Sequence, residues 1–210
     1  MSDPYHHGAL RAALLDAATD LLTTEGVEGV TMRALAERTG VSRTAPYRHF
    51  ASKDALLESV AAEGFAQLQS LLHRFAEAAP AASTRAAERA HFADIGAAYV
   101  RFADAHPAHY RLMYGHDALA RSAHPALHAA AEAAYAELVR LLADAQARGT
   151  IRTDIEPAHQ AYIAWGLVHG LASLLVDGQM ERPDDIEALA RQAILALLDG
   201  LLVPDPSVSA

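Results

Sequence analysis

Apolar residues recur at helical spacing along most of the chain, and most of these runs end at a glycine or a proline. Near the N-terminus the run consists of Leu10, Leu14, Ala17, Ala18, Leu21 and Leu22, and Gly26 follows it. This spacing places apolar side chains on one face of an α-helix. No segment alternates apolar and polar residues as a half-buried strand would, so the sequence predicts an all-α protein.

The breaks between the runs predict nine helices. We expect the first four near residues 10–25, 31–39, 43–50 and 52–79, and a fifth that carries Phe92, Ile95, Tyr99 and Phe102. The others are expected from residue 107 and near 125–148, 157–177 and 183–202. Much of the apolar content is alanine, which has the highest helix propensity. The first three helices would form an N-terminal domain over residues 1–52. The others would form a larger body over residues 53–203, followed by a tail over residues 204–210.

The segment that begins at Thr31 has the spacing of a helix-turn-helix. Thr31 can cap a short helix, Gly40 can adopt the left-handed backbone conformation that ends it, and Ser42 can cap the next helix. The second helix then carries hydrogen-bond donors suited to base edges and phosphates, namely Arg43, Thr44, Tyr47 and His49. The alternative is an ordinary helical hairpin with a solvated, charged face.

The charge distribution favours the DNA-binding interpretation. The chain as a whole has a net charge of −9, but residues 31–57 contain five basic and two acidic side chains, a net charge of +3. A small basic face on an acidic body suits local phosphate binding and disfavours unspecific coating of DNA.

The run TMRALAERTGVSRTAPYRHFASKDALL, residues 31–57, resembles the DNA-binding segment of the TetR family. The preceding YHHGALRAALLDAATDLL resembles that family's first helix. The resemblance implies that Thr31 and Arg33 anchor the second helix on the DNA backbone, at an interface that includes Ser42. It further implies base contacts from Arg43, Thr44 and Ala45, and phosphate contacts from Tyr47, His49 and Lys53. Pro46 departs from the family pattern, in which many members carry an aliphatic residue there.

The run WGLVHGLASLLVDG, residues 165–178, resembles the tryptophan–histidine–glycine motif of one TetR subgroup. Gly166 and Gly170 lie four residues apart, and each costs about 1 kcal/mol against alanine inside a helix. A helix tolerates this cost where another backbone approaches closely, as in a two-fold dimer interface. We expect that interface to include Gly166, Gly170, Leu174, Ile194, Leu197 and Leu201. Packing within one subunit is the alternative.

Trp165 and His169 share a helix face and are candidate walls of a ligand pocket. Further candidates are Tyr99, Phe102, Tyr110, Met113 and Tyr135. No charged group stands out among them, so an apolar or aromatic ligand is expected. A filled core, in which His169 bonds to a neighbouring backbone group, is the alternative.

His124, His128 and Glu132 have a spacing that could place metal ligands on one helix face. Since Pro125 is expected to start the helix, His124 would be a capping residue, and a surface role is favoured. No metal or other cofactor is therefore expected. The chain contains no cysteine, no apolar stretch of about 20 residues and no signal-peptide pattern. We thus expect a cytoplasmic protein that does not contact a membrane.

Motifs of common enzyme classes, such as GxSxG, GxGxxG and HExxH, are absent from the sequence. We therefore expect not an enzyme but a DNA-binding regulator, in the manner of a repressor. It would bind a near-palindromic double-stranded operator as a homodimer and be released by a small, largely apolar effector. The alternative is a helical dimer that binds or converts a small molecule and has no operator.

Overall fold

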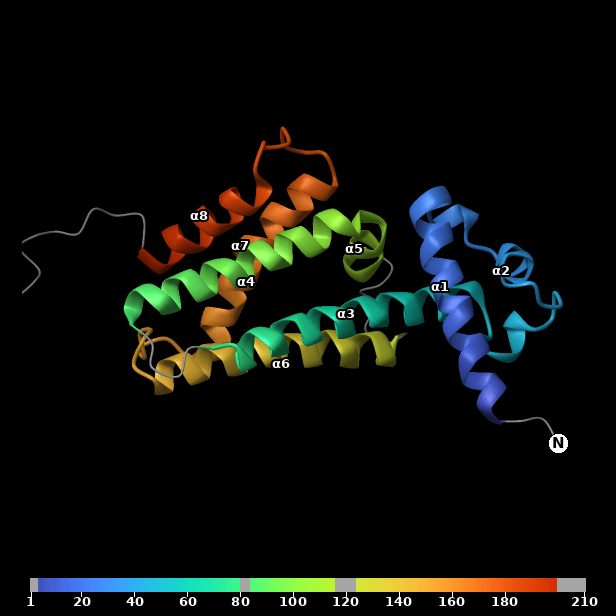
Figure 1. Cartoon of the computed structure of the whole chain (residues 1–210), viewed down its shortest axis with the longest axis horizontal. Coiled ribbons are helices and arrows are strands. Elements are labelled where there is room, and N and C mark those ends of the chain that lie inside the picture. Colours follow the sequence, from blue (N-terminus) through green and yellow to red (C-terminus); the bar gives the residue numbers. More distant parts are fainter. Residues whose placement is uncertain (1–3, 80–83, 116–123, 200–210) are drawn as a thin grey trace, which may run out of the picture. The chain divides into compact units, whose positions relative to one another are not determined.

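The computed structural model describes residues 4–79, 84–115 and 124–199 (Figure 1). The described residues contain helices and no strand, which confirms the all-α prediction. Eight α-helices and one 3₁₀ helix follow one another, rather than nine α-helices. They are α1 (Pro4–Gly29), α2 (Met32–Thr39), η1 (Pro46–Arg48), α3 (Lys53–Glu77), α4 (Arg85–Ala105), α5 (Pro107–Tyr114), α6 (Pro125–Ala147), α7 (Pro157–Val176) and α8 (Ile186–Asp199).

The predicted third helix, residues 43–50, forms only the 3₁₀ turn η1. Pro46 has no N–H to donate to the carbonyl of Ser42, and the N–H of Ala45 donates to that oxygen instead at 2.9 Å. The N–H groups of Arg48 and His49 likewise reach back three residues, at 3.1 and 3.0 Å, which is the 3₁₀ pattern. The proline that departs from the family pattern thus tightens this segment.

Most of the predicted helix ends are present. The Oγ1 of Thr31 accepts a hydrogen bond from the N–H of Ala34 at 3.1 Å, and Gly40 ends α2 with φ 68° and ψ 26°. Ser52 caps α3 by accepting from the N–H of Ala55 at 3.1 Å. Ser42 is an exception, since its hydroxyl lies 3.3 Å from the Thr44 hydroxyl and does not cap η1. The predicted caps at Thr31 and Ser52 thus form where an α-helix follows, and the one at Ser42 does not.

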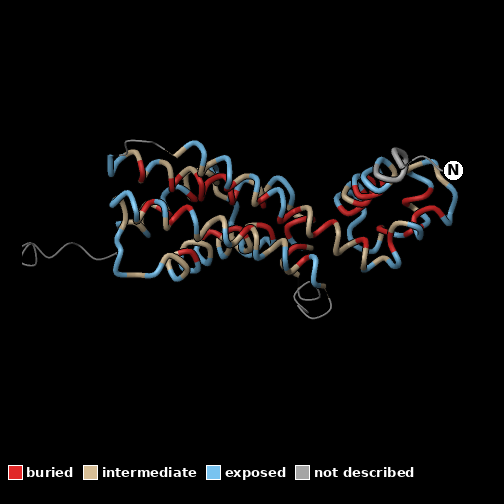
Figure 2. The backbone as a smooth tube through the Cα atoms, turned by 90° about the horizontal axis from the view of Figure 1, so that it is seen from below, coloured by how far each residue is buried: buried red, intermediate tan, exposed pale blue. Residues whose placement is uncertain are grey.

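The chain divides into two compact units, which are described separately. The N-terminal unit comprises residues 1–70 and 105–135, and the C-terminal unit comprises residues 71–104 and 136–210. Figure 2 marks their buried stretches in red and their exposed stretches in pale blue. None of the described helices is long and apolar enough to span a membrane.

The core of the N-terminal unit joins α1, α2, η1 and the start of α3. Its fully buried members include Leu14, Leu35 and Leu56, and burying each leucine side chain contributes about 1.5–3 kcal/mol. Phe50 belongs to this core, and the guanidinium of Arg11 lies 5.2 Å from the centre of its ring. Helix η1 itself packs against α2, and Phe50 ties the residues that follow it to Arg11 of α1.

Helix α5 packs against α3 in the same unit. Nε2 of His109 lies 2.6 Å from the carbonyl oxygen of Val60. Gly64 makes the close approach possible, because a Cβ there would stand 2.4 Å from Sδ of Met113 and 3.0 Å from Nε2 of His109.

Helix α4 supplies more buried residues to the C-terminal unit than any other helix described there. Glu88 is only 1% exposed, and its Oε1 accepts from Nε and Nη2 of Arg148 at 2.9 and 2.7 Å and from Oγ1 of Thr150 at 3.1 Å. A buried carboxylate requires such partners. These bonds tie α4 to the end of α6 and the residues that follow it.

Candidate nucleic-acid interface

The turn between α2 and η1 presents an exposed polar surface. The side chains of Arg33, Arg43, Thr44 and Arg48 are exposed, and Tyr47 is 58% exposed although it is a large aromatic residue. Exposed arginine, threonine and tyrosine side chains can donate hydrogen bonds to base edges and phosphates. Arg48 was not predicted as a DNA contact, although its place in the basic segment at residues 31–57 pointed to that role.

Ala45 does not belong to that exposed surface. It is 9% exposed, and Pro46 beside it is also buried. The prediction that Ala45 faces base edges is therefore wrong for this structure, because the tight turn directs the residue toward the core. His49 and Lys53 are half-buried, whereas Thr31 and Ser42 are exposed.

One acidic side chain accompanies the basic ones. Nε of Arg33 donates to Oε1 of Glu37 at 2.8 Å, one helical turn along α2. This hydrogen bond, together with the positive charge of Arg33, lowers the pKa of the Glu37 carboxyl, and the charge of Arg43 contributes in the same direction. The surface is therefore basic but not uniformly so.

In the C-terminal unit, three of the predicted ligand-binding residues come together. The indole Nε1 of Trp165 donates to the hydroxyl oxygen of Tyr99 at 3.2 Å, and Nδ1 of His169 lies 3.2 Å from the same oxygen. The Trp165 and His169 rings are 5.5 Å apart between centroids. Burial lowers the pKa of His169, so its neutral imidazole is favoured. The group combines apolar rings with polar tips.

Three of the other predicted pocket residues, Tyr110, Met113 and Tyr135, belong to the other compact unit. Tyr110 and Met113 are buried in the N-terminal unit, where Tyr110 packs on Tyr114 with 4.9 Å between ring centroids and Met113 lies against Gly64. Phe102 and Tyr135 are half-buried.

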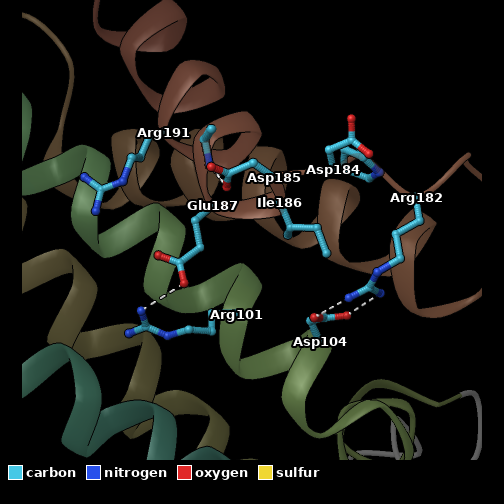
Figure 3. A pocket seen from close by; sticks show the side chains of 10 residues that line it. Arg101, Asp104, Arg182, Asp184, Asp185, Ile186, Glu187 and Arg191 are labelled. Atoms are coloured by element: carbon cyan, nitrogen blue, oxygen red, sulfur yellow. Dashed lines mark hydrogen bonds and ion pairs between the residues drawn. The ribbon is translucent and has the colours of Figure 1, made fainter.

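A surface hollow lies elsewhere in the C-terminal unit, between α4 and the start of α8 (Figure 3). Its lining is charged rather than apolar. Arg182 forms two bonds of 2.8 Å to Asp104, and Arg101 lies 3.2 Å from Glu187. The hollow thus differs in chemistry from the apolar pocket that the sequence predicted.

The predicted dimer residues fall into two groups. Gly166, Gly170, Leu174 and Leu197 are exposed, and an added Cβ would meet nothing within 4 Å at either glycine. Tyr162, Ile163 and Leu167 extend this apolar surface along α7. One surface of α7, the glycine face, consists of Ile163, Gly166, Leu167, Gly170 and Leu174.

Ile194 must be removed from the predicted interface. It is 6% exposed, and a Cβ at Gly96 would stand 2.4 Å from its Cγ1. Gly96 of α4 is therefore the recess into which Ile194 of α8 packs within the subunit. Leu201 lies outside the described residues.

The histidines considered as metal ligands form ion pairs of ordinary kinds. Nδ1 of His124 lies 3.4 Å from the carboxylate of Glu58, and Nε2 of His128 lies 3.1 Å from that of Glu132. Among the residues whose placement is described, no group of three histidine or acidic side chains is arranged to hold a metal ion.

Two family models match the chain. Residues 14–60 match "Bacterial regulatory proteins, tetR family", and residues 92–197 match "Tetracyclin repressor-like, C-terminal domain". The chain therefore belongs to the TetR family of transcriptional regulators, and its N-terminal helix-turn-helix is a DNA-binding domain.

Individual relatives agree with this assignment. The chain is 52% identical over 48 residues to the class A tetracycline repressor protein from transposon 1721 of Escherichia coli, which is 23% of this chain and only 22% of that protein. It is 24% identical over 203 residues to the uncharacterized HTH-type transcriptional regulator YobS of Bacillus subtilis (strain 168), covering 96% and 97% of the two chains. A solved protein of unknown function from Rhodococcus sp. RHA1 superposes with a TM-score of 0.76 at 36% identity, covering 94% of this chain and 99% of that one.

Proposed function

We propose that the protein is a cytoplasmic repressor that binds a near-palindromic DNA operator as a homodimer and is released by a small, largely apolar effector. The main support for the proposal is that the side chains of Arg43, Thr44 and Tyr47 are exposed together. The capped helix α2 and the turn at Gly40 position them, and the buried core of the unit lies beneath. Arginine can bond two acceptors on the major-groove edge of guanine. We assign base contacts to Arg43 and Thr44.

Phosphate contacts are assigned to the residues that surround this pair. These are Thr31, Arg33, Ser42, Tyr47, Arg48, His49 and Lys53. Lys53 stands at the first position of α3, where the helix dipole disfavours a cation. An external phosphate accounts for a lysine at this position better than helix stability does.

We assign dimerisation to the glycine face of α7 with Leu197 of α8. A row of exposed apolar side chains around two glycines loses contact with water when a second copy covers it. A two-fold dimer would place two turns of the η1 type in successive major grooves, about 34–36 Å apart. The two-fold symmetry of such a dimer is the reason for proposing a near-palindromic operator.

We assign effector binding to the C-terminal unit, around Tyr99, Trp165 and His169. Their rings supply apolar surface, and their hydroxyl, indole and imidazole groups supply a few polar contacts that can orient a ligand. If the effector binds more tightly to a dimer geometry that does not fit DNA, effector binding and operator binding weaken each other, typically by 1–3 kcal/mol.

Selection of bound duplexes from a randomised DNA library tests the proposal. The expected result is enrichment of one near-palindromic sequence, with weaker binding when a mixture of small apolar metabolites is added. If no duplex is enriched over the starting library, the operator-binding proposal is wrong. The helical dimer without an operator is then the better account.

A further inference from the structure

Glu37 is the single acidic residue between Thr31 and Lys53, in the segment assigned to DNA. An acid on a phosphate-binding surface repels DNA, so its presence calls for a reason. Its carboxylate accepts from Nε of Arg33 at 2.8 Å, and both side chains are largely exposed, at 58% and 71%.

Helix stability does not supply that reason. Arg33 lies in the first turn of α2, where the helix dipole disfavours a cation, and Glu37 lies toward the end, where it disfavours an anion. An acid placed before a base in the helix is the more stabilising order, and here the order is reversed. Such exposed pairs contribute little to folding in any case. The pair is better explained by an effect on something outside the helix.

We infer that Glu37 is a specificity-determining residue of the DNA interface: its carboxylate occupies Arg33 and so weakens sequence-independent binding to phosphate. The inference rests on the proposed DNA-binding function. Non-specific binding depends almost wholly on phosphate neutralisation, so an occupied arginine lowers it directly. Operator binding adds the base contacts of Arg43 and Thr44, and it uses Arg33 in the single orientation that the bond to Glu37 gives it, so it is weakened less. Glu37 also holds the Arg33 guanidinium in one orientation. This favours the operator complex, in which the protein has one position on the DNA, over non-specific complexes, in which it has many.

The test is Glu37→Gln, which removes the charge and keeps the shape. One further phosphate contact per subunit is two per dimer. The salt slope for non-operator DNA should therefore become steeper by about 1.8, and that affinity should rise about 30-fold at 0.15 M salt. Operator affinity should rise less, so the ratio of operator to non-operator affinity falls. An unchanged ratio would overturn the inference.

Two controls separate this role from a change in net charge. Asp20→Asn also removes an exposed acid that is paired with an arginine of α2, since Asp20 lies 3.7 Å from Arg38. It should leave the affinity ratio unchanged, and an effect equal to that of Glu37→Gln would refute the role.

In an Arg33→Gln background, Glu37→Gln should raise non-operator affinity much less than in the wild type. An equal rise in that background would show that Glu37 does not act through Arg33. Failure of the wild type to bind any duplex would instead refute the proposed function.

Discussion

Gly166→Ala and Gly170→Ala should have opposite effects on the folding of the subunit and on its dimerisation. Within one chain, a Cβ at either position meets nothing within 4 Å. Alanine is favoured over glycine inside a helix by about 0.8–1.0 kcal/mol. Each substitution should therefore raise the free energy of unfolding of the isolated subunit by nearly that amount.

In the proposed dimer the same methyl group meets the second copy. Forcing an added methyl into a close-packed contact costs about 1–3 kcal/mol. Because a two-fold interface contains each residue twice, the cost is about 2–6 kcal/mol per dimer, which weakens association at least about 30-fold. Sedimentation equilibrium measures this change, and denaturant unfolding at low protein concentration measures the subunit.

Gly96→Ala is the matched control. It gains the same helix propensity, but its Cβ would stand 2.4 Å from Cγ1 of Ile194 in the same chain. It should destabilise the subunit at every protein concentration. If the substitutions at Gly166 and Gly170 stabilise the subunit and leave the dimerisation constant unchanged, the glycine face is not the interface and the reasoning fails.

Further predictions concern DNA contacts, the buried hydroxyl and pH. Arg43→Ala should relax preference at one or two base pairs and cost about 1–3 kcal/mol. Lys53→Ala should weaken all duplexes alike and reduce the salt slope by about 1 for each subunit. Binding of the selected duplex and of its single-base variants separates the two effects, and uniform losses for both variants would contradict the assignment. Tyr99→Phe removes a hydroxyl bonded to two rings and should cost about 1–3 kcal/mol of unfolding free energy, whereas Tyr47→Phe, at a side chain 58% exposed, should not. Equal denaturation midpoints for the two variants would argue against a role of the Tyr99 hydroxyl. Burial lowers the pKa of His109, so the unfolded chain takes up the proton first, and stability should fall as the pH drops below about 6.5. His109→Gln should make the denaturation midpoint less sensitive to pH, and an unchanged pH dependence would show that His109 does not contribute.

Local rules were sufficient for much of the helix-turn-helix. The cap at Thr31 and the left-handed Gly40 depend on neighbours within a few residues, and the structure contains both. The α-helix expected over residues 43–50 did not form, and Pro46 is the reason. Its missing N–H lies opposite the Ser42 carbonyl and shortens the helix to a 3₁₀ turn, which also buries Ala45.

Whether a side chain is buried could not be predicted from its neighbours in the sequence where its packing partner lies far away in the chain. The apolar arc of α8 contains both Ile194 and Leu197, and the sequence does not say which of them faces its own core. Gly96, far away in the chain, decides this by offering a recess to Ile194. Glu88 was likewise missed, because a glutamate is buried only when paired, and its partner Arg148 lies 60 residues away.

The central claim is that two copies of this chain bind one near-palindromic duplex through the turns at Arg43. The most direct measurement is hydroxyl-radical footprinting of the selected duplex, combined with the sedimentation mass of the complex. The account predicts two chains per duplex and two protected regions related by the symmetry of the sequence, about one helical turn apart. One chain per duplex, or protection without a defined position, would contradict it.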